Sequence, residues 1–183
     1  MTATLNEFFG NGTASFGLEG NVSCQPSAGV NPAATAADNV LAVFSIPPNS
    51  LDQAGRGLAI SAVGGFAANS NNKRVKIIVG AATAVVGSTI GSGGTTIADT
   101  GTVATSGAGF QLQASVFKYG AAGSNTQIGV HNMAQMGSAT AALITPAALT
   151  LKENLPILVA VTGNATTTAT DITLNLLEVN ATN

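Results

Sequence analysis

Hydrophobic and polar residues alternate with a period of two over much of the chain after residue 39. The clearest case is FQLQASVFKYG at 110–120, in which Phe110, Leu112 and Val116 share one face and glutamines occupy the other. Successive side chains of a β-strand point to opposite faces of a sheet. The pattern therefore predicts a strand with one face in a hydrophobic core.

Further segments carry strand signals and are separated by Gly, Pro or Asn. In the last of them, Ile172, Leu174 and Leu176 are expected to face inward. The segment 155–163 is almost continuously apolar, which is typical of a strand covered on both faces. No segment has a convincing helical period. The predicted strands are 39–46, 57–67, 74–80, 82–90, 126–136, 140–145, 155–163 and 171–179, with one short strand inside the Gly/Thr-rich loop 91–109.

Eight or nine short strands predict an all-β fold, and we expect a jelly-roll-like β-sandwich over residues 39–183. There is no Trp and only one Cys, so the hallmarks of an immunoglobulin core are missing. Residues 1–38 have neither period and are interrupted by Gly, Pro and Asn. We expect this segment to be an extended N-terminal arm whose apolar residues dock on a partner or on the domain: Leu5, Phe8, Phe9, Phe16 and Leu18.

Charge is scarce in this chain. Charged residues make up 8% of it, against about 25% in an average soluble protein, and the net charge is −2. This composition gives no footprint for nucleic-acid binding, and no apolar run is long enough to predict a membrane span. The low charge indicates either a surface covered by other subunits or one hydrated by Asn, Thr and Ser. The first ten residues lack the features of a secretion signal, so we expect assembly in the cytoplasm.

The scarce cations are clustered. Lys73, Arg74 and Lys76 lie within four positions, on or beside an apolar predicted strand. The favoured interpretation is that they protect an edge strand from aggregation. Contact with an acidic patch of a partner is the next alternative, and nucleic-acid binding comes last because a single Tyr and no Trp leave few stacking platforms. Arg56, between two glycines, is expected either to reach a carbonyl or carboxylate or to be solvated.

Candidate catalytic chemistry is not evident. His131 and Cys24 are the only residues of their kinds, and no nucleophile elbow, zinc, calcium or phosphate-loop pattern is present. We expect His131 to face outward or a neighbouring subunit. Asp52, Asp99 and Asp171 fall where Asx turns are expected. The interpretation is a non-enzyme without cofactor or metal.

One long block resembles a pattern found in virion proteins of tailed bacteriophages. It runs from FSIPPNSLDQAGRGLAI into SNNKRVKIIVG, over residues 44–80, and TTIADTGTVATSGAGFQLQASVFKYG and the terminal pair of strands at 155–179 fit as well. Ala59 departs from the pattern, since a basic residue is common there. The resemblance implies a jelly-roll-like β-sandwich in the virion, often trimeric. The group includes capsid decoration (cement) proteins, head fibres and tail-associated binding modules.

The expected function is that of a non-enzymatic virion structural protein. The favoured form is a decoration protein that binds the major capsid protein on the outer shell as a homotrimer and stabilises the head. The alternatives are a fibre-tip or tail-associated receptor-binding module, or a shell subunit, with an enzyme least favoured. No nucleic-acid or membrane partner is expected. The candidate partner-binding residues are Leu5, Phe8, Phe9, Phe16, Leu18, Arg56, Lys73, Arg74 and Lys76.

Overall fold

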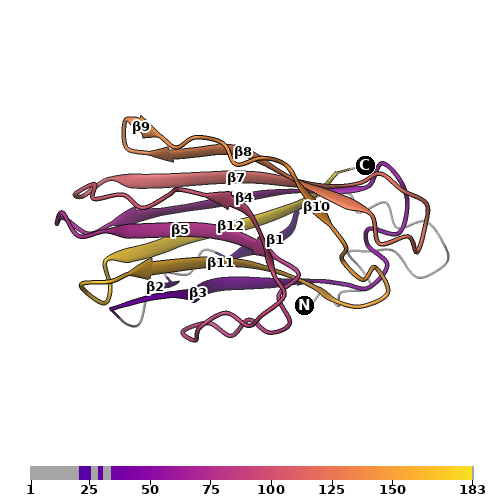
Figure 1. Cartoon of the computed structure of the whole chain (residues 1–183), viewed down its shortest axis with the longest axis horizontal. Helices are drawn as coiled ribbons and strands as arrows, with labels where there is room; N and C mark the ends of the chain where they lie inside the picture. The colour runs from indigo at the N-terminus through magenta and orange to yellow at the C-terminus, as the bar shows by residue number, and fades with distance from the viewer. Residues whose placement is uncertain (1–20, 26–28, 31–33, 183) are drawn as a thin grey trace, which may run out of the picture.

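Two antiparallel β-sheets make up the part of the chain that the computed structural model describes, residues 21–25, 29–30 and 34–182, and this part contains no helix (Figure 1). Sheet A has the order β1 (Asn21–Gln25), β12 (Ile172–Thr182), β4 (Gly57–Phe66), β7 (Gly109–Lys118), β8 (Gln127–Met136) and β10 (Ala147–Leu149). Two short strands extend it: β2 (Gly29–Val30) on β12 and β9 (Ala139–Thr140) on β8. Sheet B has the order β3 (Thr35–Ile46), β11 (Ile157–Ala165), β5 (Lys73–Val79) and β6 (Thr95–Asp99).

One hydrophobic core lies between the sheets and takes alternate residues from their strands. Phe110, Leu112 and Val116 of β7 are buried in it, as the alternation predicts. In β11, Val159 and Val161 enter the core, and Ala160 and Thr162, which point to the opposite side, are buried as well. This confirms the expectation that the apolar run is covered on both faces.

Two β-bulges shift the inward face of a strand. In β12 the pairing with β4 skips one position between Leu174 and Leu176. The prediction for Leu176 is therefore wrong, because the inward positions after the bulge are Leu177 and Val179 while Leu176 is only half-buried. A second register shift, in β8 opposite Gln113, has the same effect there. A bulge adds one residue to one strand and so inverts the alternation beyond it.

Three segments differ from the predicted strands. Residues 82–90 form a loop that runs beside β3, where Ser88 accepts a backbone hydrogen bond from Val40 and Gly87 donates one back (Figure 1). Residues 140–145 are also not a strand beyond Thr140. Conversely, β1 and β2 fall within the expected arm and pair with β12, and β3 begins at Thr35. A strand requires a partner with free backbone groups, which the local pattern does not specify.

Candidate interaction surfaces

Lys73 is the first residue of the basic cluster, and it lies inside the protein. Strand β5 is flanked by β11 and β6, so the expectation of an edge strand is wrong. The Lys73 side chain shares the inward face of Val75 and has 0% exposure. Its Nζ donates to the carbonyl oxygens of Asn69 (2.8 Å), Asn71 (3.1 Å) and Thr105 (3.4 Å). All three donors of the ammonium are thus satisfied by backbone, which joins two loops at one end of the core.

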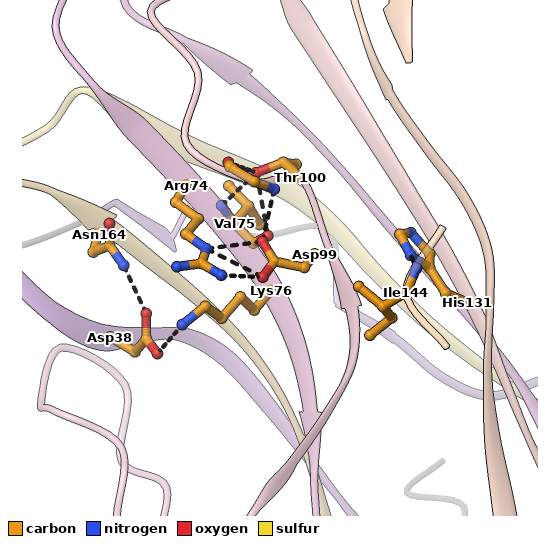
Figure 2. Close-up of polar contacts among 10 residues, drawn as sticks. Asp38, Arg74, Val75, Lys76, Asp99, Thr100, His131, Ile144 and Asn164 are labelled. Carbon is orange, nitrogen blue, oxygen red and sulfur yellow. Dashed lines mark hydrogen bonds and ion pairs between the residues drawn. The ribbon is translucent and has the colours of Figure 1, made fainter. Parts of the chain in front are cut away.

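Arg74 and Lys76 point to the other side of β5, and each pairs with a carboxylate of the same chain (Figure 2). Arg74 Nε donates to Asp99 Oδ1 at 2.9 Å, and its Nη2 donates to the second oxygen. This hydrogen bonding raises the pKa of Arg74 above its ordinary value. Lys76 Nζ lies 2.7 Å from Asp38 Oδ2, and the other oxygen of Asp38 accepts from Asn164 Nδ2 at 2.8 Å. The cluster is therefore not a free basic patch.

Arg56 is likewise paired within the chain. It is 8% exposed, and its Nη1 forms an ion pair with Asp52 and reaches the carbonyl oxygen of Asn49 at 3.4 Å. Of the two alternatives for Arg56, the contact with a carboxylate and a carbonyl is the one observed, and the solvated turn, which was the favoured one, is wrong. Asp99 also accepts from Gly101 N at 2.7 Å, which is the expected Asx turn.

A buried polar network that the sequence analysis did not single out lies at the end of β7. Lys118 forms an ion pair with Glu153, and both side chains are almost fully buried. Glu153 also accepts from Gln127 Nε2 at 2.8 Å and from Gly123 N at 2.9 Å. Gln127 in turn accepts from Leu151 N at 3.0 Å. The isolated charges of Lys118 and Glu153 gave no local signal, because they are 35 positions apart.

His131 faces the interior, which contradicts the expectation of an outward position. Its exposure is 3%, and it continues the inward positions of β8 that begin with Gln127 and Gly129. Its Nδ1 accepts a hydrogen bond from Ile144 N at 3.1 Å, and its Nε2 is buried without a partner among the described residues (Figure 2). Burial lowers the pKa of His131 below its ordinary value. The hydrogen bond from Ile144 requires an unprotonated Nδ1, and it ties the 141–146 loop to β8.

The charge of the described residues is therefore mostly used within the chain. All six Lys and Arg of the sequence lie in this part. Four form ion pairs with carboxylates, and Lys73 is held by carbonyl oxygens. Only Lys152 among the six is an exposed cation with no ion pair. Asp171 is buried and accepts from the amides of Asn69 and Asn71.

Two of the grooves on the described surface differ in the chemistry of their lining. One, of about 680 Å³, lies at an end of the molecule and is largely apolar, with Ala81, Leu155 and Leu158 in its lining and Lys152 as its one charged residue. The other, of about 350 Å³, lies on the side of sheet A that points away from the core. Side-chain amides and hydroxyls dominate it, among them Ser61 and Gln113. Neither groove brings together an acid and a base that would support catalysis.

The described residues contain no cluster of three or more His, Cys, Asp or Glu side chains that would hold a metal ion. The described residues form no helix, so they provide no helix that could span a membrane. The five apolar residues predicted to bind a partner through the arm lie outside the described residues: Leu5, Phe8, Phe9, Phe16 and Leu18.

Comparison with protein-family models, with curated protein sequences and with solved structures gave no match to the chain.

Proposed function

We propose that this chain is a non-enzymatic virion structural protein, a capsid decoration protein that binds the outer shell as a homotrimer and stabilises the head. The proposal starts from the resemblance of residues 44–80 and 95–127 to virion proteins of tailed bacteriophages. Strand order, charge use and surface composition each support it.

Strand order supports a jelly roll. Taken in chain order and leaving out the three short strands and β8, the strands number eight: β1, β3, β4, β5, β6, β7, β11 and β12. Their pairing is nested, since the first pairs with the last (β1 with β12), the second with the seventh (β3 with β11), the third with the sixth (β4 with β7) and the fourth with the fifth (β5 with β6). A long antiparallel ribbon rolled into two sheets has this pairing, and jelly rolls are frequent in viral capsid proteins. In this interpretation β8 to β10 extend sheet A at its margin.

The observation that carries the proposal is the internal use of charge. Five of the six cations are held by groups of the same chain, and neither of the two grooves described above contains a convergent acid and base. Such a surface offers little electrostatic attraction for nucleic acid and little chemistry for catalysis. It suits a protein that acts by packing against other subunits.

A receptor-binding module of a fibre tip or tail is the second candidate. One observation favours it: the groove on sheet A is lined by Gln111, Gln113 and Asn132, whose amides would hydrogen-bond a neutral glycan. The groove lacks an aromatic side chain, and this weakens the candidate, because glycan sites commonly stack a sugar on an aromatic ring. A shell subunit would share the fold, and shell assembly separates it from a decoration protein.

The test is co-sedimentation of the purified chain with empty shells built from the major capsid protein of the same genome. A decoration protein binds finished shells at saturating stoichiometry and raises the temperature at which they fall apart. A shell subunit is required for shell assembly itself. A receptor-binding module leaves shells unoccupied and binds host cells as an isolated protein.

A deletion variant tests the expected arm. Deletion of residues 1–18 removes all five apolar docking candidates and leaves every described strand intact. We expect the deleted protein to stay folded and to lose shell binding. Full retention of shell binding would remove the arm from the proposal.

A further inference from the structure

The outer face of sheet A, meaning the side that points away from the core, is almost free of charge. Its four long strands β12, β4, β7 and β8 contain one cation, Lys118, and that side chain is buried on the inner side. They contain one carboxylate, Glu178. Glu178 lines the groove of this face and is the acceptor for Asn180 Nδ2 at 3.0 Å.

Sheet B provides the contrast within the same molecule. Its outward side carries Arg74 and Lys76, which pair with Asp99 and Asp38. Free protein surfaces commonly contain about 25–35% charged residues, whereas the centres of protein–protein interfaces are depleted in charge. The outer face of sheet A therefore has the composition of an interface centre, and sheet B has ordinary paired surface charges.

Hydrogen-bonding groups on this face are mostly neutral amides and hydroxyls. Ser61 and Gln113 are cross-strand partners on β4 and β7, and Glu178 is the partner of Ser61 on β12. Asn132 donates to Ser115 Oγ at 2.6 Å, which holds one amide flat against the sheet. At one end of the face, Phe117 is 40% exposed beside Ile128, its partner on β8. The face thus combines an amide-rich centre with an apolar end.

The chemistry of this face selects its partner. An amide carries both donors and an acceptor, so a row of amides can pair with the neutral Asn, Gln, Ser and Thr side chains that fill most polar positions of this chain, and a contact between two different surfaces of the chain is what a trimer needs. Nucleic acid would require cations, and a basic protein would require more than one carboxylate. A second copy of the same chain meets the requirement without any further group.

The area is of the right order for such a contact. The four strands have ten or eleven residues each. With strands about 4.8 Å apart and a rise of about 3.4 Å per residue, they present a face of roughly 600 Å². Stable interfaces bury about 800 Å² on each partner, so a stable contact would take in the whole face and extend onto its margins.

We propose that the outer face of sheet A is the surface through which copies of this chain associate with one another. The inference deepens the homotrimer of the proposed function and rests on it for the choice of partner. Gln113 lies at the centre of the contact, and a charge introduced there loses its hydration when two copies meet, with Glu178 as the one other charge that lines this groove.

Light scattering on purified protein over a hundredfold range of concentration tests the proposal. We expect the full chain to have about three times the mass of one chain, which is 17.9 kDa. We expect Gln113→Glu and Gln113→Arg to shift the measured mass to that of a monomer or to weaken association at least tenfold. The matched controls are Ser45→Glu and Ser45→Arg, at an exposed position of β3 in sheet B, which leave the mass unchanged. Circular dichroism and the melting temperature establish that each variant is folded.

Two results would overturn the proposal: a full chain that stays monomeric at the highest concentration, or Gln113 variants that keep the assembled mass. Binding of a neutral oligosaccharide by a monomeric full chain, lost in the Gln113 variants, would assign the face to a glycan instead. Shell co-sedimentation separates this proposal from the function. Assembly that depends on Gln113 without shell binding leaves the self-association proposal standing and removes the decoration role, and shell binding by a chain whose assembly ignores Gln113 does the reverse.

Discussion

Lys118 and Glu153 form an ion pair in which neither side chain exposes more than 2% of its surface. The pair joins the end of β7 to the loop before β11, and Glu153 accepts two further hydrogen bonds, from Gln127 and Gly123. Removing one partner leaves a buried charge without compensation, which costs far more than loss of an exposed pair.

Lys118→Met is therefore expected to lower the free energy of unfolding by about 3–5 kcal/mol. Urea denaturation measures this change. Lys152→Met is the matched control, since Lys152 is exposed and precedes Glu153 directly in sequence. The control is expected to stay within about 0.5 kcal/mol of the parent protein. Equal effects of the two substitutions would contradict the assignment of a buried network.

The two lysines of β5 provide a second comparison. Lys73 is fully buried and donates to three carbonyl oxygens, whereas Lys76 lies on the outward side in a partly exposed ion pair. Lys73→Met leaves these oxygens unsatisfied, and we expect a loss of about 1.5–3 kcal/mol. Lys76→Met is expected to cost at most about 1 kcal/mol. Thermal and urea unfolding of both variants would reveal the reverse order if the strand faced the other way.

His131 makes stability depend on pH. Its pKa is lowered in the folded protein, so the unfolded chain binds the proton more tightly. Stability is therefore complete above the unfolded pKa of about 6.5 and falls as the pH drops from there towards the folded pKa, with a slope of up to about 1.4 kcal/mol per pH unit. Unfolding free energies measured between pH 7.5 and 5 test the slope.

His131→Asn is the informative variant for that slope. The Asn side chain offers an acceptor for Ile144 N in place of Nδ1 and does not titrate. We expect its stability to be nearly flat between pH 7.5 and 5. A variant that retains the full slope would show that carboxylates, and not His131, cause it.

Adjacent glycines of β4 differ sharply in the space around them. A Cβ added at Gly64 would overlap the Thr173 carbonyl oxygen and lie 2.5 Å from Phe110 Cζ, whereas one added at Gly65 meets nothing within 4 Å. Gly64→Ala is expected to destabilise the protein by about 1–3 kcal/mol through overpacking. Gly65→Ala is expected to be neutral or to stabilise by up to about 1 kcal/mol. Melting temperatures of the two variants, which differ by one position, measure the contrast directly.

The alternation of the sequence was sufficient to predict which residues of β7 enter the core, because a regular strand keeps one face throughout. The outward expectation for His131 failed because β8 turns Gln127, Gly129 and His131 inward, and not the more apolar Ile128 and Val130. The alternation itself failed at Leu176, where a bulge inverts the faces of β12. A bulge is defined by the pairing of two strands, and the sequence of one strand does not contain the partner's register.

The interpretation of the basic cluster failed for a similar reason. Whether β5 is an edge strand depends on the order of the strands, and the partners of Arg74 and Lys76 lie 25 and 38 positions away along the chain. By contrast, the scarcity of charged residues in the strands of sheet A was visible in the sequence. The glutamines of 110–120 and the position of every cation were known, but only the strand order shows that four such strands lie side by side.

The place of β12 in sheet A has a consequence for synthesis. β12 lies between β1 and β4, so β1 has its partner only when residues close to 182 have been made. The edges of β1 and β4 that pair with β12 therefore stay open until β12 has been made. Long-range pairing of this kind is slow. Low charge along these strands would leave them prone to pair with neighbouring nascent chains. The edges of β1 and β4 that await β12 are therefore the points at which unfinished chains would associate.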